Sequence, residues 1–159
     1  MASLAQEIGN LLRQKGLSLG VVESASGGLI SHLITNVPGS SDYYKGSITA
    51  YRDEIKVGVV GVKSGTVNKY GAVSPQVAEE MAAGGRKILA SDICLADTGI
   101  AGPTGGSAEK PVGLFYIGLS HQGGTSSQKH IFPGSREENK QAAARAALGW
   151  LKEYLTSLK

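Results

Sequence analysis

Residues 23–28 read Glu-Ser-Ala-Ser-Gly-Gly and separate two segments of different periodicity. Residues 17–22, Leu-Ser-Leu-Gly-Val-Val, predict a strand, and residues 29–34, Leu-Ile-Ser-His-Leu-Ile, predict a helix. A hydroxyl-rich, glycine-backed turn of this kind exposes a serine oxygen at the end of a strand. It also presents free backbone N–H groups at a helix start to an anion. The turn therefore suits either a nucleophilic serine or a phosphate cradle.

Length and composition indicate one globular domain over residues 1–159. A chain of 159 residues buries about two-thirds of its unfolded surface. The hydrophobic content of 41% and the charged content of 18% are typical of folded proteins. The net charge is +3, and the sixteen Lys and Arg residues are scattered along the chain. We therefore expect a small anionic ligand and no nucleic-acid partner.

The single cysteine, Cys94, excludes an intrachain disulfide and a Cys-based zinc cluster. It lies in the apolar run 92–96, so we expect a buried, unreactive thiol. No apolar run reaches the roughly 18 residues of a membrane helix. The first residues also lack the pattern of a signal peptide. We expect a cytoplasmic protein with no membrane contact, no metal and no cofactor.

Periodicity and cap signals predict alternating helices and strands. In chain order we expect helix 3–15, strand 17–22, helix 29–35, strand 46–51, short helix 53–56, helix 75–90, strands 93–96, 112–120 and 128–132, and a final helix from 135 to 158. This order predicts an α/β fold with three layers, α/β/α, around a mixed, mostly parallel central sheet. Ligands bind at strand ends in such sheets, where residues 23–28, 51–56, 98–110 and 134–140 would gather.

A nucleophilic serine at position 24 needs a base, because a free hydroxyl stays protonated at neutral pH. The three histidines are poor candidates for this base. His32 lies inside a predicted helix, and His121 and His130 lie in or beside the late hairpin. We therefore do not expect a Ser-His-Asp triad.

A lysine serves as the base if burial lowers its pKa toward about 7–8. Lys56 is the leading candidate, at the end of residues 51–56, Tyr-Arg-Asp-Glu-Ile-Lys. Tyr51 would stand at a strand end with Lys56 about one helical turn further, so that both point to one site. A solvated charge on a helix face is the alternative for this lysine.

Residues 99–106, Gly-Ile-Ala-Gly-Pro-Thr-Gly-Gly, favour anion binding more strongly. Four glycines in eight residues permit positive φ angles, and successive N–H groups then form a nest for phosphate. The segment lacks the Lys-Ser ending of a P-loop, which argues against nucleoside triphosphate hydrolysis. A flexible connector is the alternative.

Cations beside this loop fit the same interpretation. Lys110 would either order the loop or contact a phosphate. Arg136 and Lys140 lie in the first turns of the last helix, where cations oppose the helix dipole. A docked anion would explain their position, and a solvated pair of charges is the alternative.

Several ordered blocks resemble the C-terminal domain of the CinA family. Besides residues 23–28 and 51–56 they are Pro-Gly-Ser-Ser at 38–41, Gly-Ala-Val-Ser at 71–74, Thr-Gly-Ile-Ala-Gly-Pro at 98–103 and Glu-Lys-Pro-Val-Gly at 109–113. The resemblance covers about residues 5 to 155. Members that consist of this domain alone resemble nicotinamide mononucleotide deamidases. These enzymes hydrolyse the carboxamide to nicotinate mononucleotide and ammonia without a metal.

The resemblance implies roles for individual residues. The family's nucleophile falls on Ser24, its activating lysine on Lys56, and its motif tyrosine on Tyr51, as a proton partner or ring contact. Backbone N–H groups of residues 24–28 would stabilise the oxyanion. Substrate binding is expected of Ser26, Gly27, Gly28, Thr98, Gly99, Gly102, Gly105, Gly106, Lys110, Arg136 and Lys140.

The chain departs from the family pattern in four places. The family usually has Cys-Thr where this chain has Ala25-Ser26, and Asn where it has Asp53. It usually keeps an apolar residue at Asp97 and an arginine at Lys140. Lysine keeps the charge of that arginine but loses its bidentate fork.

The sequence leaves three functions open. The first is an amidohydrolase acting on nicotinamide mononucleotide. The second is a catalytically silent nucleotide-binding module in which Asp53 and Asp97 have spoiled the Ser-Lys dyad. The third is a partner-binding protein of DNA uptake or damage response. In each case we expect a homo-oligomer.

Overall fold

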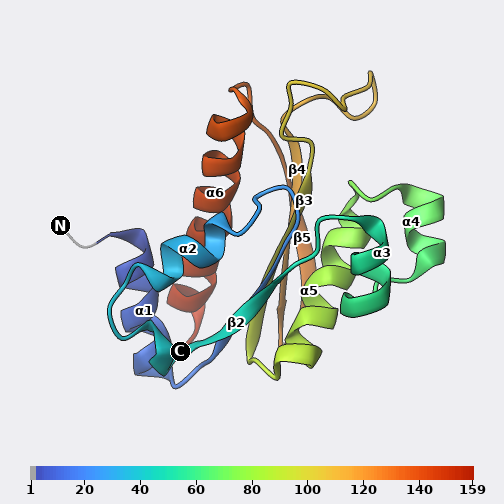
Figure 1. The fold of residues 1–159 in the computed structure, drawn as a ribbon. Helices are drawn as coiled ribbons and strands as arrows, with labels where there is room; N and C mark the ends of the chain where they lie inside the picture. The colour runs from blue at the N-terminus through green and yellow to red at the C-terminus, as the bar shows by residue number, and fades with distance from the viewer. Residues whose placement is uncertain (1–2) are drawn as a thin grey trace.

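A five-stranded sheet forms the middle layer of the structure, a computed structural model that describes residues 3–159 (Figure 1). The strands are β1 Leu19–Glu23, β2 Tyr44–Thr49, β3 Ile93–Gly99, β4 Leu114–His121 and β5 Gly124–Ile131, in the spatial order β2-β1-β3-β4-β5. β1 pairs in parallel with β2 and β3, whereas β4 runs antiparallel to β3 and β5. Four strands therefore share one direction, which confirms the mixed, mostly parallel sheet.

Helices cover both faces of this sheet (Figure 1). On one face lie α1 Leu4–Lys15, α2 Leu29–Thr35 and α6 Arg136–Ser157. On the other face lie α5 Pro75–Leu89 and, outside it, α3 Asp53–Ile55 and α4 Ser64–Tyr70. This arrangement confirms the predicted three layers.

Side chains of successive strand residues enter two separate cores. Val21 and Leu95 pack under α1, α2 and α6, whereas Val22 and Ala96 pack under α5. Because successive residues of a strand point to opposite faces, a strand covered on both sides is apolar throughout. Cys94 is fully buried in the α5 core, and burial raises the pKa of its thiol to about 12. The predicted buried thiol is confirmed.

Local capping signals place the helix starts where the sequence predicts them. The Ser74 side chain accepts the Val77 N–H at the start of α5, with Pro75 in the first helical position. Ser135 and Glu138 form a reciprocal capping box at the start of α6. Gly16 ends α1 in the left-handed conformation.

Several elements differ from the prediction. α4 was not expected, residues 56–60 form a π-helical turn, β2 begins two residues before 46, and β5 begins at Gly124 rather than at 128. The sequence of α4 is rich in poor helix formers, and its first turn depends on Glu80 of α5. The Glu80 carboxylate accepts the Lys63 N–H and the Thr66 hydroxyl. β5 is an edge strand of mostly polar residues, so its apolar pattern is weak.

Close packing of α5 on β4 predicts a sensitive glycine at position 118. A Cβ on Gly118 would lie 2.3 Å from the Ala78 carbonyl oxygen of α5. We expect Gly118→Ala to lower the free energy of unfolding by about 1–3 kcal/mol in urea titrations. Gly149→Ala in α6 is the control, because a Cβ there meets nothing within 4 Å. It should raise stability by about 0.5–1 kcal/mol. Equal effects of the two variants would contradict this packing.

Candidate functional site

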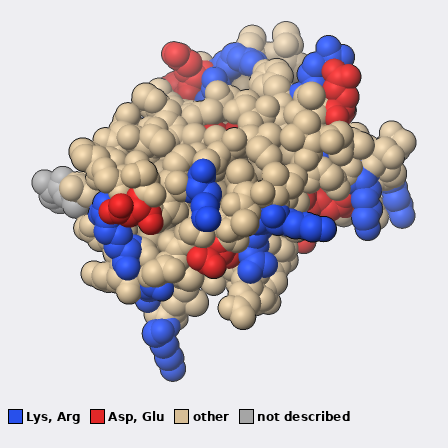
Figure 2. All heavy atoms as spheres, turned by 60° about the horizontal axis from the view of Figure 1, so that its bottom comes forward, with Lys and Arg blue, Asp and Glu red and all other residues tan. Residues whose placement is uncertain are grey.

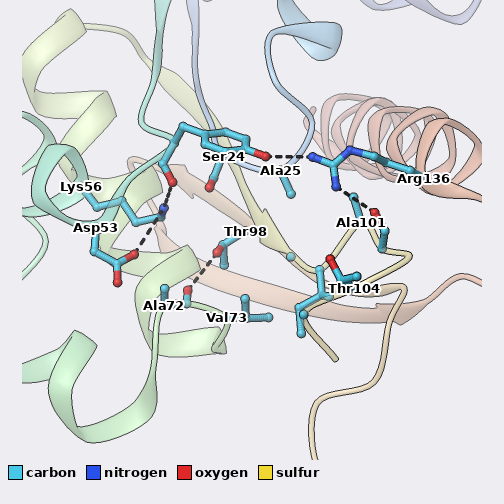
Figure 3. A pocket seen from close by; sticks show the side chains of 15 residues that line it. Ser24, Ala25, Asp53, Lys56, Ala72, Val73, Thr98, Ala101, Thr104 and Arg136 are labelled. Carbon is cyan, nitrogen blue, oxygen red and sulfur yellow. Dashed lines mark hydrogen bonds and ion pairs between the residues drawn. The ribbon is translucent and has the colours of Figure 1, made fainter. Parts of the chain in front are cut away.

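A pocket of about 270 Å³ opens at the carboxyl ends of β1 and β3 (Figure 3). It is lined from all four junctions that the sequence predicts at the strand ends, by Ser24, Ala25, Tyr51, Asp53, Lys56, Ala72, Val73, residues 98–102, Thr104, Gly105 and Arg136. Lys56 and Asp53 stand on one side of the pocket and Arg136 on the other, with Ser24 between them (Figure 3). The structure thus brings Ser24, Tyr51 and Lys56 into one site.

Lys56 is almost completely buried, with 2% of its surface exposed. Its ammonium group donates a hydrogen bond of 2.9 Å to the Tyr51 carbonyl oxygen and lies 3.8 Å from the Asp53 carboxylate. Burial lowers the pKa of Lys56, and the negative charges of Asp53 and Asp97 partly offset this effect. A lysine with a lowered pKa is the kind of base that a serine nucleophile needs.

Within residues 3–159, no hydrogen bond joins the Ser24 hydroxyl to Lys56 Nζ. The lysine must leave the Tyr51 carbonyl, or share its protons, before it can accept a proton from Ser24. Hydrogen bonds between a nucleophile and its base often form fully only when substrate is bound.

Arg136 connects the two rims of the pocket. One guanidinium nitrogen donates to the Tyr51 hydroxyl at 2.9 Å, and another donates to the Gly102 carbonyl oxygen at 2.8 Å. The Tyr51 side chain is 56% exposed, so this bond fixes a ring that would otherwise be free to turn. A guanidinium has five N–H donors, so others are available for a ligand. The cation at this helix start is thus explained first by contacts within the chain.

Two buried carboxylates hold the turn that carries Ser24. Asp97 of β3 accepts the N–H groups of Ser24 and Ser26 at 3.1 and 3.0 Å. Glu23 accepts the N–H groups of Ile30 and Ser31 at 2.9 and 3.0 Å. The prediction that this helix start is free for an external anion is therefore wrong. The chain's own carboxylate already occupies it.

These bonds leave few donors for a developing oxyanion. In addition, Gly27 donates to the Ser24 carbonyl oxygen and Leu29 donates to that of Ser26. Of the N–H groups in residues 24–28, only those of Ala25 and Gly28 have no hydrogen-bond acceptor within the described chain. Ala25 lines the pocket with Ser24, whereas Gly28 does not. The expected oxyanion contact is thereby reduced to the Ala25 N–H, directly after the serine.

The glycine-rich loop is held in place by contacts at several points. Thr98 Oγ1 donates to the Ala72 carbonyl oxygen, and Asn139 donates to that of Ala101. Lys110 Nζ donates to the Tyr70 carbonyl oxygen at 2.6 Å, which ties the far end of the loop to α4. Of the two roles considered for Lys110, the structure supports ordering of the loop. The loop is not a loose connector.

The predicted substrate-binding residues fall into three groups. Thr98, Gly99, Gly102, Gly105 and Arg136 line the pocket with Ser24. Ser26, Gly27, Gly28 and Lys140 line a neighbouring hollow of about 320 Å³ on the other side of the turn. Gly106 packs against the backbone of Val112, and Lys110 contacts Tyr70; neither lines the Ser24 pocket.

Sequence reasoning missed several residues that shape the pocket. Ala72 and Val73 line it just before the Ser74 cap, within the 71–74 block, and Thr104 lines it from the glycine-rich loop. Asn139 holds the loop from the second turn of α6. The only sequence signal for Ala72 and Val73 is that block, which the motifs do not connect to a role.

Two of the three histidines pack against aromatic rings. His121 stacks on Tyr154 and His130 on Phe132, which agrees with packing roles. Between residues 3 and 159, no group of three or more His, Cys, Asp or Glu side chains is arranged to hold a metal ion. No helix of this range is long and apolar enough to span a bilayer. On the face drawn in Figure 2, Lys and Arg side chains are dispersed among Asp and Glu. That nucleic acid does not bind stays a prediction.

Comparison with known proteins places the chain in a family. A model of the CinA C-terminal domain matches residues 1–155. The chain belongs to the CinA C-terminal domain family. The matched range covers β1, β3, the Ser24 turn and the glycine-rich loop, so the resemblance found in the sequence motifs is confirmed.

Individual CinA relatives agree with this assignment. A CinA-like protein from Kosmotoga olearia is 46% identical over 156 residues, which are 98% of this chain and 38% of that protein. The competence/damage inducible protein CihA from Agrobacterium tumefaciens is 34% identical, with a TM-score of 0.85 over 99% of this chain and 100% of that one. A CinA superfamily protein from Klebsiella pneumoniae has a TM-score of 0.94 at 28% identity, over 98% of this chain and 97% of that one. The chain spans little more than a third of the length of the curated relatives it matches.

The tether made by Lys110 predicts a local change in dynamics. In Lys110→Met the hydrogen bond to the Tyr70 carbonyl is lost, so residues 64–70 and 104–110 should exchange their amide protons faster. Hydrogen–deuterium exchange followed by mass spectrometry measures this. Lys129→Met on the exposed edge of β5 is the matched control and should change neither segment. Unchanged exchange in Lys110→Met would mean that the tether does not order the loop.

Proposed function

We propose that this CinA domain is an amidohydrolase that converts nicotinamide mononucleotide to nicotinate mononucleotide and ammonia. The observation that carries the proposal is the buried Lys56, whose pKa is lowered, in the same pocket as Ser24. A buried lysine without a complete ion pair is costly, so such a residue beside a serine favours a catalytic role over a structural one.

In this mechanism the Ser24 hydroxyl oxygen attacks the carboxamide carbon, and neutral Lys56 takes the hydroxyl proton. The carbonyl oxygen becomes an oxyanion that accepts the Ala25 N–H. The C–N bond then breaks, and Lys56 returns the proton to the departing ammonia. A water molecule gives a proton to Lys56 and attacks the acyl-enzyme. This step releases nicotinate mononucleotide and restores the Ser24 hydroxyl.

The charges of the pocket suit a substrate that carries both signs. Nicotinamide mononucleotide has a pyridinium cation and a phosphate. Asp53 lies on one side of the pocket with a half-exposed carboxylate, and Arg136 lies on the opposite side (Figure 3). The exposed Tyr51 ring offers a face for a cationic ring. We place the pyridinium near Asp53 and Tyr51, and the phosphate near Arg136 and the glycine-rich loop.

A silent nucleotide-binding module is the second candidate. Two observations favour it. Lys56 donates its hydrogen bond to the Tyr51 carbonyl oxygen and not to Ser24, and the Asp53 and Asp97 carboxylates raise the pKa of this lysine. Ammonia release discriminates between the candidates. Stabilisation of the protein by the nucleotide without any ammonia release would support the silent module.

We also expect assembly into a homo-oligomer, which sedimentation would test.

Removal of the nucleophile or the base should abolish turnover. We expect Ser24→Ala and Lys56→Met each to lower the rate of ammonia release from nicotinamide mononucleotide by about 10³-fold or more. Thermal unfolding should show that both variants fold. Ser126→Ala and Lys129→Met on β5 are matched controls and should keep the wild-type rate. Normal turnover by Ser24→Ala would rule out this serine as the nucleophile.

Asp53 should shift the pH dependence of the reaction. Its negative charge raises the pKa of Lys56, so Asp53→Asn should let this lysine lose its proton at lower pH. The ascending limb of kcat/KM against pH should therefore move to lower pH. Glu54→Gln is the control, because Glu54 pairs with Arg52 at 3.0 Å and does not line the pocket. If the ascending limb of kcat/KM does not move in Asp53→Asn, the group that titrates in this limb is not Lys56.

A further inference from the structure

Two fully buried carboxyl groups flank one hydroxyl beneath the candidate site. Glu23 of β1 and Asp97 of β3 are both 0% exposed and lie on the face of the sheet covered by α2 and α6. The Ser26 hydroxyl lies 2.6 Å from Glu23 Oε1 and also hydrogen-bonds Asp97 Oδ1. Two buried carboxyl groups that contact the same hydroxyl repel each other when both are ionised, and a proton on one of them removes this repulsion.

With both carboxyl groups ionised, this cluster has one hydrogen too few for its hydrogen bonds. The Ser26 hydroxyl has a single hydrogen, yet it contacts acceptor oxygens on both sides. The other donors to these carboxyl groups are the N–H groups of Ser24, Ser26, Ile30 and Ser31 and the Ser31 hydroxyl. None of them lies between Ser26 Oγ and either carboxyl oxygen. Both contacts of the Ser26 hydroxyl are satisfied as hydrogen bonds when one carboxyl group carries a proton and donates it to Ser26.

The distribution of donors favours Asp97 as the protonated group. Glu23 receives three donors besides Ser26, which are the N–H groups of Ile30 and Ser31 and the Ser31 hydroxyl. Asp97 receives two, from Ser24 and Ser26. Hydrogen bonds to a carboxylate stabilise its charge, so the negative charge is better placed on Glu23. Burial raises the pKa of Asp97 to about 6, and the nearby Glu23 adds to this effect.

We propose that Asp97 is a positioning residue that carries a proton, and that the chain from Asp97 through Ser26 to Glu23 fixes the turn of Ser24. In this arrangement the protonated Asp97 donates to the Ser26 hydroxyl, which donates to Glu23. Asp97 also accepts the N–H groups on both sides of Ala25. The Ser24 hydroxyl and the Ala25 N–H are thereby held toward the pocket.

Asp97 interacts electrostatically with Lys56, the proposed base. Glu23 faces it from β1, the Asp97 charge acts on Lys56 of the π-helical turn, and the opposite position on β4 is the apolar Ile117. From α6, Lys140 lies against Gly27 on the outer side of the turn. When Asp97 loses its proton, its charge raises the pKa of Lys56 and favours the inactive ammonium. This catalytic consequence rests on the proposed function, whereas the proton itself can be measured without substrate.

Carboxyl NMR of the wild-type protein tests the proton directly. The chain has only four aspartates, so protein labelled with ¹³C at the Asp side-chain carboxyl gives four resonances. The Asp97 resonance is assigned by its loss in Asp97→Asn. If that variant does not fold, the other three are assigned with Asp42→Asn, Asp53→Asn and Asp92→Asn. We expect the Asp97 resonance to titrate near pH 6. A resonance that is fully ionised at pH 5 overturns the proposal.

The stability of Asp97→Asn against pH provides a second test. The pKa of Asp97 is 3.8 in the reference state and about 6 in the fold, so the folded protein binds more protons between these values. The stability contribution of this group is thus present below pH 3.8 and lost as the pH rises through 6. Asparagine does not titrate. Asp97→Asn should therefore be most destabilised relative to wild type near pH 4, and less so at pH 7.

Glu138→Gln is the control of opposite sign. The Ser135 N–H bond lowers the pKa of Glu138, so this variant should lose stability relative to wild type as the pH rises. If Asp97→Asn behaved like Glu138→Gln, then Asp97 would be an ordinary ionised carboxylate and the proposal would be overturned.

Kinetics separate positioning from general structural support. In Asp97→Asn we expect kcat to fall by about 10²-fold with KM little changed, because Ser24 is misplaced while the pocket remains. The ascending limb of the pH profile should also move to lower pH, since the charge on Lys56 is no longer favoured. An unchanged kcat and pH profile overturns the positioning role. If Asp97 titrates near pH 6 but the wild-type protein releases no ammonia, the protonation of Asp97 is upheld and the proposed function is rejected.

Discussion

The shared contact between Glu23, Ser26 and Asp97 is the interaction on which the candidate site depends. The two carboxyl groups accept four backbone N–H groups, those of Ser24 and Ser26 and those at the start of α2. Burying a carboxyl group is costly unless it is hydrogen-bonded, so the bonds and the turn stabilise each other. Ser24 and Ala25 then line the pocket, and the Ala25 N–H has no hydrogen-bond acceptor within residues 3–159.

This arrangement gives the strand-to-helix turn a different role from the one its composition suggests. A turn rich in serine and glycine at a helix start is often an anion site. Here Glu23 accepts the N–H groups at the helix start from within the chain, and the glycine-rich loop, Arg136 and Ala25 line the pocket beside Ser24. The turn is therefore not a phosphate cradle, and in the proposed reaction its Ala25 N–H, directly after the serine, would contact the oxyanion.

The layers, the order of the long elements and the meeting of the four junctions were predictable because they follow from local signals. Apolar periodicity gives the strands and helices, and Ser74-Pro75 and the capping box at Ser135 give helix starts. Parallel strands end at one edge of a sheet, so Ser24, Lys56 and residues 98–105 had to lie close together. α4 could not be predicted in this way, because Glu80 from another helix completes its first turn.

The contacts of individual site residues were beyond local reasoning. Ser26 and Asp97 lie 71 positions apart in the sequence, and Lys110 and Tyr70 lie 40 apart. Nothing in a local pattern shows that Asp97, a departure from the family pattern, holds the turn of Ser24. For the same reason the sequence did not separate Gly27 and Lys140, in the neighbouring hollow, from the residues around Ser24.

The most direct test of this account is a crystal structure of the Ser24→Ala variant with nicotinamide mononucleotide bound. The account predicts a carboxamide whose oxygen lies within hydrogen-bond distance of the Ala25 N–H, with the pyridinium ring beside Tyr51 and Asp53. Nucleotide in the hollow lined by Gly27 and Lys140, or a carboxamide directed to solvent, would contradict it.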